Sequence, residues 1–207
     1  MPRRRAQRRR ITTRRANLAV ACVAIVLAVL AAGSVWLLDR VGRPATGAIG
    51  GPFALTQADG HVVTQRDFRG RYLLLYFGYT SCPDVCPTTL SAIADAVGIL
   101  GARADRLRAV FVTVDPHRDT AHVVAAYVRH FGGRIIGLSG TPEQITAMER
   151  AYHVTSVVYP NERDPGQYSV GHTAVLFLVG PDGRYLRAFA PMESGPDLAR
   201  KLAAYLA

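Results

Sequence analysis

The chain has 207 residues and a formal net charge of +10, but this charge is concentrated at one end. Eight of its 25 basic residues are arginines within the first 15 positions, and the remaining chain holds 17 basic and 15 acidic residues. A nucleic-acid-binding domain needs basic side chains spread over a folded face, so this distribution argues against one. We therefore expect no nucleic-acid partner and interpret residues 1–16 as a solvated cytoplasmic tail.

An uncharged apolar run, Asn17–Leu38, follows the arginines. Its 22 residues are enough to cross a hydrocarbon core of about 30 Å as a helix. The arginines before it predict a cytoplasmic N-terminus and an extracytoplasmic C-terminal domain. The run exceeds a usual signal-peptide core, which favours an uncleaved anchor over a cleaved signal peptide or a mitochondrial transit peptide. A single lysine against 24 arginines indicates a GC-rich bacterial source, and hence a single-pass protein of the bacterial cytoplasmic membrane.

Residues 39–51 are rich in glycine, arginine and proline and predict a linker, whereas residues 52–207 are enough for one domain with its own core. Strand-like and helix-like segments alternate along this domain, which predicts an α/β fold with a central sheet covered on both faces. In chain order we expect a hairpin (53–55 and 61–63), a strand (72–77), a helix (87–100), a strand (109–114), a helix capped by Asp119 or Thr120 (to 130), a strand (135–138), a helix (141–152), two antiparallel strands (173–179 and 184–189) and a final helix (197–206).

The predicted domain contains one pair of cysteines, Cys82 and Cys86, in the loop after strand 72–77. The third cysteine, Cys22, lies in the apolar run and is expected to be inert. Parallel strands present their carboxyl ends at one edge of a sheet, where ligands bind, so the cysteine loop and the loop at Asp115–His117 should be neighbours. A helix start beside the cysteines would favour the thiolate form. The pair can therefore close a redox-active disulfide or bind a thiophilic metal.

Two sulfurs leave most metal sites incomplete, so a third ligand is expected. Soft thiolates select copper(I), zinc or iron–sulfur centres, and imidazole suits copper and zinc. Four of the six histidines are expected on the surface or at a helix end, which leaves His117 and His172, and the pattern does not decide between them. Met192 is interpreted as a packing residue. A purely structural disulfide would close a very short loop and stabilise the fold only modestly.

Three segments resemble the Sco/SenC family: Tyr79–Pro87 (YTSCPDVCP), Val114–Thr120 (VDPHRDT), and Ser169–Thr173 (SVGHT) with the turn Gly180–Gly183 after it. The resemblance covers nearly all of the chain from Gly51 onward. It implies a thioredoxin-like sandwich, with a central mixed sheet flanked by helices, on a membrane anchor. It also implies copper binding and delivery of copper to the binuclear copper centre of cytochrome c oxidase.

Carried over by motif, the resemblance makes Cys82, Cys86 and His172 the copper ligands, and it favours His172 over His117. One position departs from the family pattern: Gly171 stands where the family usually has an aspartate before the ligand histidine. We expect this change to weaken copper(II) binding or to loosen His172.

Three functional hypotheses follow. The first is a copper chaperone for the copper-site subunit of cytochrome c oxidase, with a thiol reductant or another copper chaperone as a further partner. The second is an extracytoplasmic thiol–disulfide oxidoreductase that reduces the cysteines of a copper-site protein. Ordinary thioredoxins have two residues between their cysteines, and the three residues here favour the metal hypothesis. The third is a redox or copper sensor that signals through the anchor, but nothing in the arginine-rich tail specifies its partner.

Overall fold

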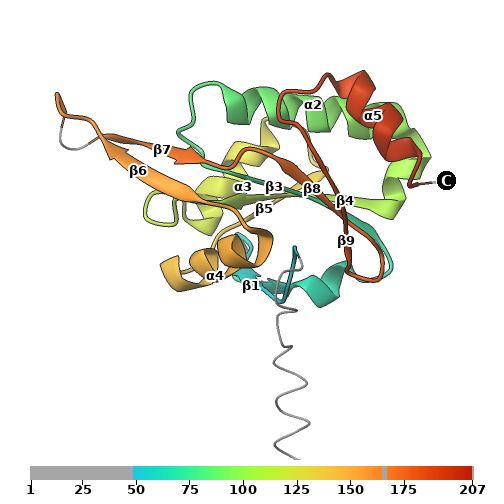
Figure 1. Ribbon diagram of the computed structural model, residues 1–207, viewed down its shortest axis with the longest axis horizontal. Coiled ribbons are helices and arrows are strands. Elements are labelled where there is room, and N and C mark those ends of the chain that lie inside the picture. Colours follow the sequence, from blue (N-terminus) through green and yellow to red (C-terminus); the bar gives the residue numbers. More distant parts are fainter. Residues whose placement is uncertain (1–48, 165–166, 207) are drawn as a thin grey trace, which may run out of the picture. The chain divides into compact units, whose positions relative to one another are not determined.

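The computed structural model describes residues 49–164 and 167–206 (Figure 1). The predicted tail (1–16), the anchor (17–38) and most of the linker (39–51) therefore lie outside the described residues. At the start of the described part, Ile49 packs against the core and the Gly50 N–H donates to the Ala151 carbonyl at 2.7 Å.

One helical stretch of the described residues, Val85–Arg106, is long and apolar enough to cross a membrane. This is weak support for a membrane span, because a helix buried in a protein core passes the same test. The stretch packs against the C-terminal helix of the domain, as such a core helix does.

A five-stranded mixed sheet forms the centre of the domain, with strand order β5-β4-β3-β8-β9. Four of its strands run in one direction and β8 runs against them, because β8 pairs antiparallel with both β3 and β9. Their bounds are β3 (Tyr72–Gly78), β4 (Leu107–Thr113), β5 (Ile135–Leu138), β8 (Leu176–Val179) and β9 (Tyr185–Phe189). Every residue of β3 after Tyr72 is buried. A strand covered on both faces needs apolar side chains on both, which explains its continuous apolar run.

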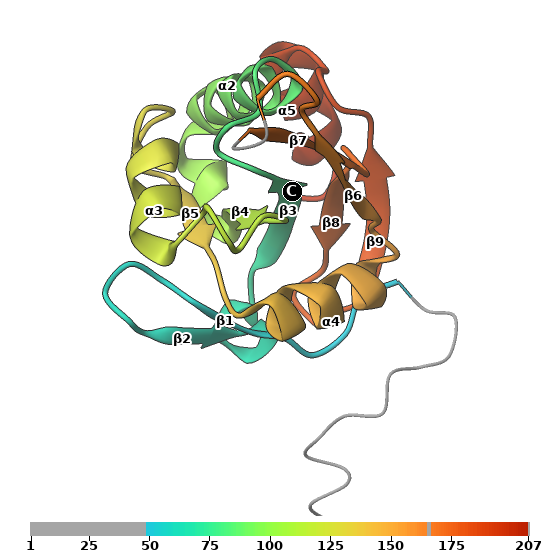
Figure 2. The ribbon, with the colours of Figure 1, turned by 90° about the vertical axis from the view of Figure 1, so that its left-hand side faces the viewer.

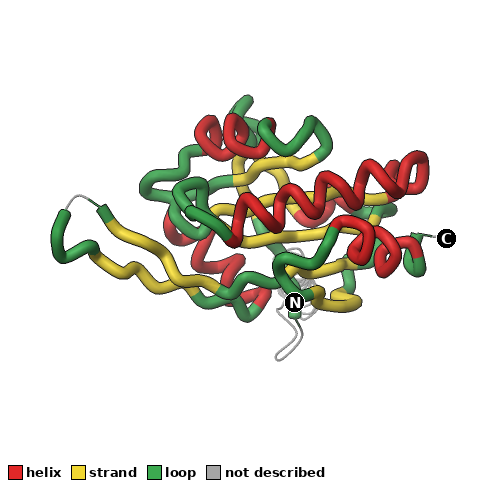
Figure 3. Tube along the Cα trace, turned by 90° about the horizontal axis from the view of Figure 1, so that it is seen from above, coloured by secondary structure: helices red, strands yellow, loops and turns green. Residues whose placement is uncertain are grey.

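Helices cover both faces of this sheet, as predicted. Figure 2 shows α2 and α5 on one face, α4 and the β1–β2 hairpin on the other, and α3 beside β5. Figure 3, the view from above, shows the two helices α2 and α5 side by side. The bounds of these elements are β1 (Ala54–Thr56), β2 (Val62–Thr64), α2 (Val85–Leu100), α3 (Ala121–Arg129), α4 (Pro142–Tyr152) and α5 (Gly195–Ala203), with short 3₁₀ turns at η1 (Gln65–Phe68) and η2 (Gly101–Arg106).

Neighbouring residues of β3 build two separate halves of the core. Phe77 points to the α4 face, where its ring packs 5.7 Å from that of Tyr152. Tyr76 points to the opposite face and packs 6.0 Å from Phe111, whose ring also contacts Tyr127 of α3. The alternation of side chains along a strand thus gives one core on each side of the sheet.

The helix starts follow the capping rules, with one difference at the cysteines. Thr120 caps α3, whereas Thr141 and Gln144 form a capping box at α4. The helix expected from Pro87 begins two residues earlier, at Val85. Cys86 therefore lies inside the first turn of α2 and only Cys82 precedes the helix.

A second hairpin, absent from the expected elements, is formed by β6 (Ser156–Pro160) and β7 (Tyr168–His172). It projects from the domain beyond the ends of the main strands (Figure 1). Strand β8, expected from residue 173, begins only at Leu176, and three residues separate it from the end of β7 at His172. The β-branched and aromatic residues 157–159 are the sequence signal that could have revealed it.

Candidate metal centre

Gly78 allows the cysteine loop to approach the end of β3 closely. A Cβ atom at this position would lie 2.8 Å from the Cys86 Sγ atom and 2.7 Å from a ring carbon of Phe111. The first turn of α2 can pack here only because the glycine has no side chain. Cys86 is fully buried as a result, while Cys82 stays partly exposed at the loop.

The cysteine loop is tied to the end of β4 by Asp119. This buried carboxylate accepts from the Thr80 N–H at 2.8 Å and the Thr113 hydroxyl at 2.7 Å, and the Thr80 hydroxyl also donates to it. The two loops are thus neighbours, as predicted. Of the two expected cap residues, Thr120 caps the helix and Asp119 holds the cysteine loop instead.

Three donor atoms converge at this edge: the sulfurs of Cys82 and Cys86 and a ring nitrogen of His172, all within 4.8 Å of one another. The Cys86 Sγ atom lies 3.6 Å from His172 Nε2, and the Cys86 N–H points to the Cys82 sulfur at 3.4 Å. Both cysteines are free thiols. Within residues 49–164 and 167–206, this is the one group of histidine, cysteine or acidic side chains close enough to share a metal ion.

The ring of His172 is held in an orientation suited to metal binding. Its Nδ1 atom lies 3.2 Å from the Thr173 carbonyl oxygen, which assigns the proton to Nδ1 and leaves the Nε2 lone pair facing the sulfurs. The ring of Tyr79 meets it edge-on, with 5.9 Å between centroids. Burial lowers the pKa of His172, with the Thr173 carbonyl opposing this effect, so the neutral form is favoured.

Burial raises the pKa of the Cys86 thiol to about 12, and a hydrogen bond with the Cys82 thiol acts in the same direction. The expectation that the start of the helix favours the thiolate is therefore wrong for Cys86 in the metal-free protein. Removing this sulfur from water disfavours its charged form more than the helix favours it. A bound cation would reverse this balance, because a coordinating thiol is deprotonated outright.

The other candidate residues lie apart from the three donors. His117 is exposed on its loop and does not join the group, and Met192 is half exposed with a left-handed backbone (φ 57°) where packing was expected. The remaining histidines are exposed: His61, His122, His130 and His153.

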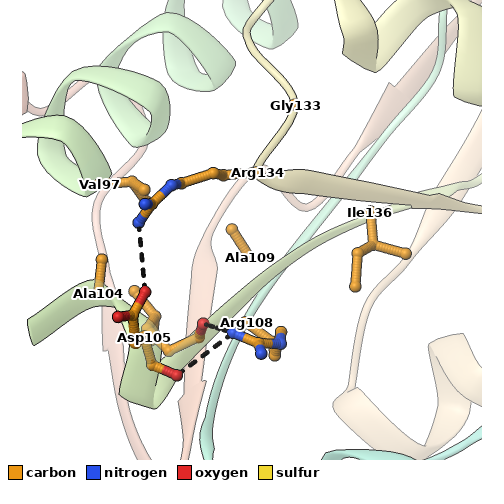
Figure 4. A pocket seen from close by; sticks show the side chains of 9 residues that line it. Val97, Ala104, Asp105, Arg108, Ala109, Gly133, Arg134 and Ile136 are labelled. Atoms are coloured by element: carbon orange, nitrogen blue, oxygen red, sulfur yellow. Dashed lines mark hydrogen bonds and ion pairs between the residues drawn. The ribbon is translucent and has the colours of Figure 1, made fainter. Parts of the chain in front are cut away.

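A pocket of about 370 Å³ lies elsewhere, at the start of β4 and β5 (Figure 4). The Arg134 side chain reaches across it to Asp105, with 3.7 Å between the charged atoms, and Arg108 donates to backbone carbonyls there. The dithiol follows the opposite, carboxyl end of β3. This pocket is therefore separate from the candidate metal centre.

The chain matches a known protein family over most of its length. The family model described as SCO1/SenC matches residues 42–207. The chain is 37% identical over 168 residues to the mouse protein SCO1 homolog, mitochondrial, covering 80% of this chain and 58% of the relative. It is 35% identical over 148 residues to a SCO2-like protein of Rickettsia felis, covering 72% of each. The chain thus spans little more than half the length of the mouse relative.

Solved structures show the same fold. The structure of Bradyrhizobium japonicum ScoI with copper bound is similar at a TM-score of 0.71 and 39% identity, over 76% of this chain and 99% of that one. Yeast Sco1 with copper bound matches at a TM-score of 0.70 and 29% identity, over 77% of this chain and 88% of that one. With its mixed sheet and flanking helices in the thioredoxin-like arrangement, the chain belongs to the SCO1/SenC family.

Proposed function

We propose that the protein is a copper chaperone that binds one copper ion through Cys82, Cys86 and His172. The observation that carries this proposal is the convergence of two thiol sulfurs and one imidazole nitrogen within 4.8 Å. Two thiolates and one imidazole form a soft, three-donor set, which suits copper(I), whereas a closed structural zinc site takes four ligands. Solved relatives from one bacterium, yeast and a plant contain copper, which supports the same choice of metal.

The chain's own groups can carry out the binding steps. Both thiols release a proton when they bind the metal, and His172 is already neutral with its Nε2 atom directed at Cys86. The partly exposed Cys82 gives an incoming ion access to the buried sulfur of Cys86. Copper would reach Cys82 first and be transferred to a recipient from the same side.

We propose the copper-site subunit of cytochrome c oxidase as the recipient and an extracytoplasmic location, with residues 17–38 as a single anchor in a bacterial membrane. A solved relative, BsSco, is described as a member of the Sco family of cytochrome c oxidase assembly proteins. The arginines before residue 17 support a cytoplasmic N-terminus. A thiol reductant would keep the dithiol reduced, since only thiolates bind the metal.

Copper titration of the reduced full-length protein in mild detergent tests the ligand set. Wild type should bind one equivalent of copper(I), and Cys82→Ser, Cys86→Ser and His172→Ala should each lose tight binding. His117→Ala is the matched control, because this histidine lies on the adjacent loop but outside the donor group. Loss of binding in His117→Ala with retention in His172→Ala would refute the assignment.

A second candidate function is thiol–disulfide exchange with a copper-site protein. Two observations favour it. Both cysteines are free thiols, and Cys82 is partly exposed. The two residues are also in contact, because the Cys86 N–H points to the Cys82 sulfur at 3.4 Å. Exchange would begin by attack of the Cys82 thiolate on a target disulfide, and Cys86 would then release the reduced target and close the internal disulfide. This chemistry does not need His172, so His172→Ala separates the two functions: exchange persists while copper binding is lost.

A further inference from the structure

Arg118, on the loop after β4, binds Tyr168, the first residue of β7. The Arg118 guanidinium pairs with the buried carboxylate of Asp115, and its Nη1 atom donates to the Tyr168 carbonyl at 3.0 Å. The same guanidinium stacks on the Tyr168 ring, 3.6 Å from the ring centroid. One side chain thus binds both the backbone and the ring of Tyr168.

The Tyr168 hydroxyl closes this cluster. It donates to the Asp115 Oδ1 atom at 2.8 Å, while Oδ2 of the same carboxylate faces Arg118. Each of the three side chains therefore contacts the other two. Charged hydrogen bonds are stronger than neutral ones and add geometric specificity. The cluster therefore fixes the orientation of the Tyr168 side chain and keeps it close to the loop after β4.

Tyr79 connects the Arg118–Asp115–Tyr168 cluster to the cysteine loop. Arg118 also lies over the ring of Tyr79, 5.8 Å from its centroid. The Tyr79 ring meets His172 edge-on, with 5.9 Å between centroids. Tyr79 stands three residues before Cys82, so it joins the cysteine loop to the strand that carries the histidine.

Val170 is the one buried residue of β6 and β7, so the hairpin supplies little else to hold β7 in place. In the described part of the chain, β7 pairs only with β6, as a separate two-stranded sheet. Three residues of β6 are more than half exposed: Val157, Val158 and Tyr159. An isolated two-stranded hairpin is marginally stable, so its placement depends on contacts with the main domain.

We propose that Arg118 is the positioning residue that, with Asp115 and Tyr168, holds β7 against the domain so that His172 faces the dithiol. The consequence for copper rests on the proposed function, whereas the hold on β7 can be measured without metal. Arg118 itself touches none of the three donor atoms. It acts through Tyr168 and Tyr79.

Two variants test this proposal. Arg118→Lys keeps a positive charge beside Asp115 but removes the planar fork that stacks on Tyr168 and reaches its carbonyl. Tyr168→Phe keeps the stacked ring and removes only the bond to Asp115. Arg184→Lys is the matched control, since Arg184 pairs with Asp182 at 3.7 Å on an exposed turn at the start of β9.

The first measurement is hydrogen exchange of the reduced, metal-free, full-length protein. In Arg118→Lys, peptides covering residues 168–172 should exchange about tenfold faster, while β3 and α2 keep wild-type protection. Tyr168→Phe should give a smaller increase in the same peptides, and Arg184→Lys none. A general loss of stability would instead raise exchange throughout the domain.

The second measurement combines the electron paramagnetic resonance spectrum and the visible absorption spectrum of the copper(II)-loaded protein. Arg118→Lys should weaken the nitrogen coupling from His172, as His172→Ala does, and keep the sulfur-to-copper charge-transfer absorption. Wild-type exchange in residues 168–172 of Arg118→Lys would overturn the proposal. If that variant does not fold, unchanged exchange in Tyr168→Phe would overturn it equally. Failure of the wild type to bind copper would refute the proposed function alone, since the exchange result stands without metal.

Discussion

The ring of Tyr159 lies against Gly171 on the β6–β7 hairpin, so closely that a Cβ atom at position 171 would sit 2.8 Å from Tyr159 Cε2. The two residues are diagonal neighbours, because Gly171 pairs with Val157 and Ser169 pairs with Tyr159. Gly171, where the family resemblance predicts an aspartate, therefore leaves the space that the Tyr159 ring occupies.

Gly171→Asp should displace the Tyr159 ring and destabilise the metal-free protein by about 1 kcal/mol, through crowding on the hairpin. The double variant Gly171→Asp/Tyr159→Ala should lose less than the sum of the two single changes, because the aspartate then meets no ring. Chemical denaturation of all four proteins in the cycle measures this. Strict additivity would show that the two positions are independent.

Asp119→Ala should destabilise the protein by about 3 kcal/mol, since it leaves the partly buried donors of Thr80 and the buried hydroxyl of Thr113 without their acceptor. Asp119→Asn should cost less, because one oxygen remains to accept. Urea denaturation gives these values, with exposed Asp182→Asn as the control. Equal stability of Asp119→Ala and wild type would contradict the role of Asp119 as a tie between the cysteine loop and β4.

The apparent affinity for copper should rise with pH between about pH 6 and pH 8. The Cys86 pKa of about 12 means that its thiol is protonated throughout this range and must release a proton when the metal binds. One released proton corresponds to about tenfold tighter binding per pH unit. Competition titrations at several pH values measure this slope, and an affinity independent of pH would show that Cys86 is not a ligand.

Alkylation should distinguish the two thiols of the reduced, metal-free protein. Cys82 is partly exposed, whereas Cys86 is buried and its raised pKa keeps it as the less nucleophilic thiol form. At neutral pH, iodoacetamide should therefore modify Cys82 first, as peptide mass mapping with time can show. Faster modification of Cys86 would mean that the loop opens in solution and would argue against a preformed site.

Much of the fold was predictable because the signals are local. The apolar run at 72–77 and the capping residues Thr120 and Thr141 act within a few positions of the elements they define. The β6–β7 hairpin was missed because its exposed residues do not build the main core and show no long apolar run. Its β-branched segment was the available signal.

The candidate site was only half predictable from the residues. Cys82 and Cys86 share one loop, so their spacing alone indicates a common site. His172 lies 86 positions from Cys86, and only the fold brings them to 3.6 Å, which is why the pattern could not separate His172 from His117. The role of Asp119 was missed for a similar reason, since its partner Thr80 is 39 positions away.

The three donor atoms belong to two structural units of different strength. Both sulfurs sit at the end of the buried β3 strand, whereas the imidazole is carried by a projecting hairpin. Removing the nitrogen from the ion thus requires β7 to leave its contacts with Arg118 and Asp115 and to move with β6, with no rearrangement of the main sheet. A recipient that draws this hairpin aside would leave copper on two sulfurs, open on one side to its own ligands.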